Sequence, residues 1–83
     1  FPIQPRKATP EEITMVHDPG YVASVEQSCA NAVRNLDADT VISSSSYDAA
    51  LLSAGAGLTA IDKLIDGSIQ NAFCAVRPPG HHA

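Results

Sequence analysis

The chain is poor in basic residues. It holds five lysines and arginines against nine aspartates and glutamates, which gives a formal net charge of −4 and an isoelectric point near 5.0. Because nucleic-acid-binding proteins need a clustered basic face, we expect no nucleic-acid partner, and the acidic balance favours small cationic partners. No apolar run reaches the roughly 18 residues of a membrane-spanning helix, and no basic segment with a short apolar region opens the chain. These absences predict no membrane partner and, by default, a cytoplasmic location.

Cysteine is also scarce. Cys29 and Cys74 lie far apart in the sequence, and they form neither a Cys-x-x-Cys motif nor the spacing of a small disulfide-stapled scaffold. Cysteine that is neither paired nor reactive usually packs as a small apolar side chain. We therefore predict two reduced, buried thiols.

Two helices are predicted in the first half of the chain. Thr9 can cap a helix over residues 10–17, because Pro10 suits the first helical position and Glu12 completes a capping box. Asp18, followed by proline and glycine, ends this helix and caps a second one that runs to about Asn35. Apolar residues recur in the second helix at spacings of three and four, which predicts one buried stripe. The stripe consists of Val22, Val25, Cys29 and Val33.

A polar loop over residues 36–45 separates these helices from a longer one. The long helix is predicted from Ser46 to about Asp66, with Gly67 as its left-handed cap. Its apolar and small residues cover more than one face, which is typical of a helix inside a large protein. A chain of 83 residues has difficulty covering such a helix.

Residues 71–76 read Asn-Ala-Phe-Cys-Ala-Val, an apolar run without alternation. This pattern is typical of a strand buried on both faces of a parallel sheet, yet the sequence contains no second convincing strand. Helices followed by one buried parallel strand predict an α/β fold that is incomplete as it stands. We interpret the chain as a piece of a larger domain.

Two adjacent histidines, His81 and His82, follow the expected strand on a turn made of two prolines and a glycine. Histidine exchanges protons near neutral pH, and ligands of open α/β folds bind at the carboxyl ends of strands. Adjacent side chains on extended backbone diverge, so we expect different roles for the two imidazoles and not chelation of one ion. The alternative is a pair of ordinary surface-loop histidines.

The sequence of this turn resembles the signature loop of the histone deacetylase and acetylpolyamine amidohydrolase superfamily, in its class II or bacterial branch. The loop reads Arg77-Pro78-Pro79-Gly80-His81-His82-Ala83. The resemblance extends over the predicted helices through residues 8–22, 39–56 and 64–72. It implies an arginase-deacetylase fold with three layers, in which residues 1–83 are the N-terminal fragment of a single catalytic domain.

The resemblance also implies the chemistry. A zinc-bound water would attack the acetamide of acetyl-lysine, an acetylpolyamine or a related acetylated amine, with His82 as general base and His81 placing the water. Asp39 matches a rim aspartate that accepts hydrogen bonds from the substrate, although an ordinary exposed loop acid is the alternative. Residues 43–46 are all serine where the family often has Ser-Pro-x-Ser, which predicts a looser loop.

The family's zinc ligands, an Asp-x-His pair and a further aspartate, follow the signature loop and are therefore expected beyond Ala83. We predict zinc as the cofactor, no metal ligand within residues 1–83, and no activity for these residues alone. A binding or structural module with incidental histidines is the competing hypothesis, motivated by the same missing ligands.

Overall fold

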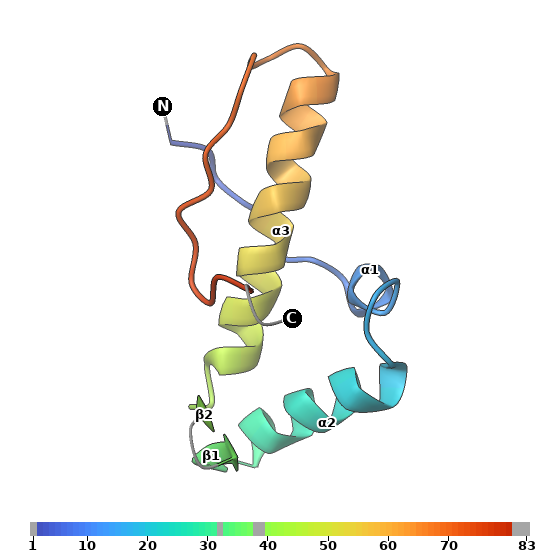
Figure 1. The fold of residues 1–83 in the computed structure, drawn as a ribbon, viewed down its shortest axis with the longest axis vertical. Coiled ribbons are helices and arrows are strands. Elements are labelled where there is room, and N and C mark those ends of the chain that lie inside the picture. The colour runs from blue at the N-terminus through green and yellow to red at the C-terminus, as the bar shows by residue number, and fades with distance from the viewer. Residues whose placement is uncertain (1, 32, 38–39, 81–83) are drawn as a thin grey trace.

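The computed structural model describes residues 2–31, 33–37 and 40–80 of the chain. Three helices and two short strands form in it, and the longest element is helix α3 (Figure 1). Figure 1 also shows the N-terminal segment crossing α3, and the segment after α3 returning along it. In chain order the elements are α1 (Pro10–Ile13), α2 (Pro19–Ala30), β1 (Asn35–Asp37), β2 (Thr40–Val41) and α3 (Ser46–Ile65).

The start of α1 forms as the sequence predicts. The Glu12 backbone N–H donates to the Thr9 hydroxyl at 3.2 Å, and the Thr9 N–H donates to the Glu12 carboxylate at 2.9 Å, which completes the capping box. The predicted end at His17 is wrong, because the helix ends at Ile13 and continues only as turns. Val16 is 85% exposed, so packing of this side chain does not support further helical turns.

Helix α2 also begins as predicted, with the Asp18 carboxylate accepting from the Gly20 N–H at 2.7 Å. It ends at Ala30 and not near Asn35, because Asn35 begins a strand. The predicted stripe is buried only in part, since Val22 and Cys29 are buried while Val33 lies beyond the helix and is 42% exposed.

Strands β1 and β2 pair antiparallel, with Asn35 opposite Val41 and Asp37 opposite Thr40. The Ile42 N–H donates to the Arg34 carbonyl at 2.7 Å and extends this contact beyond the ladder. The prediction of a polar loop over residues 36–45 is therefore wrong at this point. Three consecutive β-branched residues, beginning at Thr40, favour extended backbone here.

Helix α3 has the predicted extent and the predicted C-terminal cap. Gly67 has a φ of 83°, its N–H donates to the Leu64 carbonyl, and the Ser68 N–H donates to the Lys63 carbonyl at 3.0 Å. This is the Schellman arrangement, which needs a residue that tolerates a left-handed conformation. The helix buries Leu51, Gly55 and Ala60 and leaves part of its apolar surface exposed.

Residues 71–76 do not form the predicted buried strand. They have no strand assignment, and Phe73 is 92% exposed. A strand requires a hydrogen-bonded partner, and the strand pair in the described part of the chain lies elsewhere, at β1 and β2. The prediction of two reduced, buried thiols is correct for Cys29 and wrong for Cys74. Both cysteines are free, but Cys74 is exposed because it lies on this unpaired segment.

The described residues therefore show helices and one antiparallel strand pair, and they do not show a three-layer fold. Among the helices of this part of the chain, none has the length and apolar character needed to cross a membrane.

Candidate functional site

The three residues predicted to act on the substrate, Asp39, His81 and His82, lie outside the described residues. The structure instead describes the segments that carry them. Residues 77–80 lead into the histidine pair, and Thr40 follows Asp39 at the start of β2. Contacts with α3 hold residues 77–80 and the N-terminal segment in place.

Residues 77–80 form a turn beside α3. The hydroxyl of Ser53, on α3, donates a hydrogen bond of 2.5 Å to the carbonyl oxygen of Pro78. The Arg77–Pro78 peptide bond is cis, and Gly80 has a φ of 79°. No neighbouring atom crowds the place where a Cβ of Gly80 would stand, so the backbone conformation and not space favours glycine at this position. The sequence predicted the rigid turn, but it contains no signal that pairs Ser53 with a carbonyl 25 residues away.

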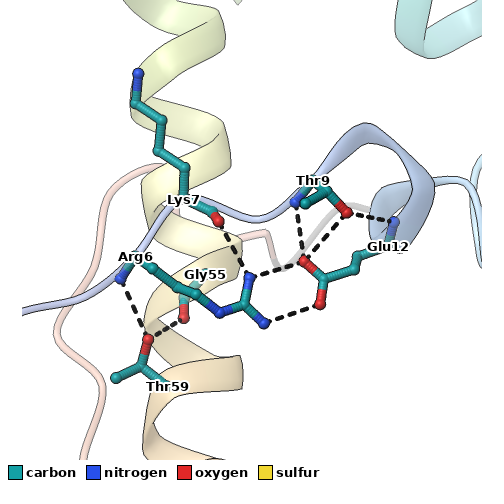
Figure 2. A network of polar contacts seen from close by, with 6 residues as sticks. All are labelled: Arg6, Lys7, Thr9, Glu12, Gly55 and Thr59. Carbon is teal, nitrogen blue, oxygen red and sulfur yellow. Dashed lines mark hydrogen bonds and ion pairs between the residues drawn. The ribbon is translucent and has the colours of Figure 1, made fainter.

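The N-terminal segment crosses the same helix. The Arg6 N–H donates to the Thr59 hydroxyl at 3.2 Å, and the Ala8 N–H donates to the Leu51 carbonyl at 2.9 Å. Between these contacts the chain passes directly over Gly55, and the Thr59 hydroxyl in turn donates to the Gly55 carbonyl at 2.9 Å (Figure 2). Helix α3 is thus held by the N-terminal segment within one turn on either side of Ser53.

An ion pair joins this crossing to α1. The Arg6 guanidinium donates to both Glu12 carboxylate oxygens, at 2.8 and 2.9 Å, and also to the Lys7 carbonyl at 3.1 Å (Figure 2). The hydrogen bonds from Arg6, aided by the Thr9 N–H, hold the pKa of Glu12 at about 2 against an ordinary value of 4.5. The capping carboxylate is therefore charged at neutral pH and is occupied by structural partners.

A groove of about 740 Å³ runs between the N-terminal segment, α3 and the segment after α3. Its lining is mainly apolar or amide-bearing, and it includes Ile3, Ala60, Asn71, Phe73 and Val76. Neither a carboxylate nor an imidazole lines it, and its one ionisable side chain among the lining residues is the thiol of Cys74.

A smaller hollow of about 270 Å³ lies between α1, α2 and the start of α3, where Glu11, Glu26 and Tyr47 meet. The Tyr47 hydroxyl is buried and has no hydrogen-bond partner among the described residues. Burial raises the pKa of this phenol, and the charges of Glu26, Asp48 and Glu11 raise it further. Tyr47 is therefore a neutral phenol, suited to donating a hydrogen bond, and the sequence analysis assigned it no role.

A metal centre is not formed by the described residues. No group of three or more histidines, cysteines, aspartates or glutamates within residues 2–31, 33–37 and 40–80 could hold an ion. His17, the histidine that these residues contain, lies with its ring 6.0 Å from the ring of Tyr21. The described residues alone therefore do not supply the set of ligands that a zinc site requires.

Comparison with known proteins identifies the family. The family model described as "Histone deacetylase domain" matches residues 1–83, including the turn that carries the histidine pair. The chain belongs to the histone deacetylase domain family, and the resemblance drawn from the sequence is confirmed.

Individual relatives agree with this assignment. The chain is 39% identical to the human polyamine deacetylase HDAC10 in an alignment of 83 residues. This alignment covers 93% of this chain and 12% of that protein. It is 37% identical to a probable deacetylase of Archaeoglobus fulgidus, covering 98% of this chain and 22% of the relative. It is 35% identical to a histone deacetylase-like amidohydrolase of Pseudomonas aeruginosa, and the alignment covers 96% of this chain and 22% of that protein. The chain thus spans between 12% and 22% of the length of these relatives. No solved structure matches it.

Proposed function

We propose that this chain is the N-terminal part of a single catalytic domain of a zinc-dependent deacetylase. The domain would hydrolyse the acetamide of acetyl-lysine, an acetylpolyamine or a related acetylated amine. The observation that carries the proposal is the family match over residues 1–83, which ends on the proline, glycine and histidine turn.

In this proposal the chain's own residues take the roles that the family resemblance implies. His82 takes a proton from the attacking water as the water oxygen bonds to the acetyl carbon. The carbon–nitrogen bond then breaks, and His82 returns the proton to the departing amine, so that acetate and the free amine are the products. His81 orients the water and stabilises developing charge, and Asp39 accepts hydrogen bonds from the substrate.

Zinc enters this proposal with ligands from another part of the domain, since no cluster among the described residues can hold it. Bound there, zinc would activate the water and polarise the acetamide carbonyl. Residues 1–83 would then be inactive alone. Residues 71–76, of which all but Val76 are exposed, would become a parallel strand when the remaining domain supplies partners. This strand would complete the arginase-deacetylase fold.

The proposed substrates are acetylated amines that carry further positive charge. A chain with a net charge of −4 favours cationic partners, and both acetyl-lysine peptides and acetylpolyamines carry further amines. The relative named as a polyamine deacetylase supports including acetylpolyamines in the proposal.

The proposal is tested with the full-length protein that contains this segment. Acetate release is measured from an acetyl-lysine peptide and from an acetylated polyamine, with and without a chelator. We expect chelation to abolish the reaction, zinc to restore it, and His82→Ala to lower kcat by about 10²–10⁴-fold. His17→Ala serves as the matched control, because His17 lies on the turn after α1 and is expected to leave kcat unchanged.

Full activity of the His82→Ala protein would contradict the assignment of the base. Zinc-dependent acetate release by residues 1–83 alone would contradict the incomplete site. A full-length protein that releases no acetate from either substrate would favour a non-catalytic binding module.

A further inference from the structure

In the described part of the chain, the turn that leads to the histidine pair is tied to α3 by a hydrogen bond. Within the described residues, the hydrogen bond from Ser53 to the Pro78 carbonyl is the only one made by residues 70–80. The prolines at positions 78 and 79 have no backbone N–H, so half of the turn's backbone donors are missing. The turn can therefore be held mainly through its carbonyl groups, and Ser53 supplies the donor.

Ser53 donates from a fixed position. It lies between Leu51, whose carbonyl accepts from the Ala8 N–H at 2.9 Å, and Gly55, over which the N-terminal segment passes. Leu51 and Gly55 are both buried. A helix clamped on both sides in this way offers a rigid support for the serine hydroxyl.

We propose that Ser53 is a positioning residue for the histidine pair, an inference that rests on the proposed deacetylase function. Ser53 acts through the Pro78 carbonyl, which lies three residues before His81 in the sequence, and it is assigned no contact with substrate. Because general acid–base catalysis depends on where the imidazole is held, release of the turn lowers the rate of the chemical step more than it weakens substrate binding.

The experiment uses the full-length protein and two variants at this position. Ser53→Ala removes the hydroxyl, and Ser53→Thr keeps it. We expect Ser53→Ala to lower kcat about three- to tenfold, in line with the loss of one hydrogen bond, with KM within about twofold of the parent. Ser53→Thr restores kcat, and Ser24→Ala, at an exposed serine of α2, leaves it unchanged. Alanine is a strong helix former, so the Ser53→Ala protein is expected to keep its melting temperature.

A second readout does not depend on activity. The NMR order parameter of the Gly80 amide reports how firmly the turn is held, because it measures the motion of that N–H bond, and it is expected to be lower in the Ser53→Ala protein. An unchanged Gly80 order parameter, or unchanged kcat despite a lower one, overturns the inference. A parent protein that releases no acetate refutes the proposed function instead, and the Gly80 order parameter then decides alone whether Ser53 holds the turn.

Discussion

The carbonyl oxygen of Arg6 lies so close to Gly55 that a Cβ atom at position 55 would stand 1.7 Å from it. Glycine is therefore required on this face of α3 because the N-terminal segment occupies the space of a side chain. The contact lies two residues from Ser53, whose hydroxyl donates to the Pro78 carbonyl, so both ends of the described chain contact the same part of α3.

Gly55→Ala is expected to destabilise the protein by about 1–3 kcal/mol, because the backbone of Arg6 cannot yield as a flexible side chain could. Gly57→Ala is the matched control in the same helix, since no atom lies within 4 Å of its added Cβ. Helix propensity predicts that this control gains about 0.5–1 kcal/mol. Urea unfolding of the full-length protein measures both, and equal effects of the two substitutions would refute the crossing described here.

The pair of Arg6 and Glu12 predicts a specific acid dependence of stability. The folded-state pKa of Glu12 is about 2, below the ordinary value of 4.5, so the contribution of Glu12 is fully present above about pH 4.5 and is lost as the pH falls towards 2. Glu12→Gln is expected to flatten the change of unfolding free energy over this range. Glu11→Gln, in the same helical turn, is the control and is expected to retain the slope. Unfolding midpoints measured from pH 2 to 6 test this, and an unaltered slope in Glu12→Gln would show that the pair does not form.

Substitution of two glycines with positive φ, Gly67 and Gly80, distinguishes an effect on stability from an effect on activity. Gly80 and Gly67 have φ values of 79° and 83°, and no atom lies within 4 Å of an added Cβ at either position. Alanine at each is expected to cost about 1 kcal/mol in backbone strain. Only Gly80→Ala is expected to lower kcat, by about tenfold, because the strained turn carries the histidine pair. Melting temperatures and steady-state kinetics of the full-length variants decide this, and equal loss of kcat in Gly67→Ala would argue against a special role for the turn.

The exposure of Cys74 tests the proposed completion of the domain. In residues 1–83 Cys74 is exposed and Cys29 is 1% exposed, so iodoacetamide is expected to modify Cys74 alone in the folded segment. In the full-length protein the strand at residues 71–76 would be covered, and we expect both thiols to resist modification. Mass spectrometry of alkylated peptides supplies the measurement. Rapid labelling of Cys74 in the full-length protein would contradict the burial of this strand.

Local signals in the sequence predicted local structure well. The capping box at Thr9, the cap at Asp18 and the left-handed Gly67 each form as expected, because every one involves residues within a single turn of the chain. The predictions that failed concerned where α1 and α2 end and which segments form strands. Residues 71–76 have the composition of a buried strand, but strand formation depends on partners that the described residues do not provide.

The family was readable from residue order alone, because the motif that indicates it, Arg77 to Ala83, is a run of consecutive residues. The support of the turn was not readable. Ser53 lies 25 residues from Pro78, and Arg6 lies 53 residues from Thr59, so only the path of the chain across α3 brings either pair together. Hydrogen bonds between distant residues depend on where the helix places its donors, and this placement is a property of the folded chain.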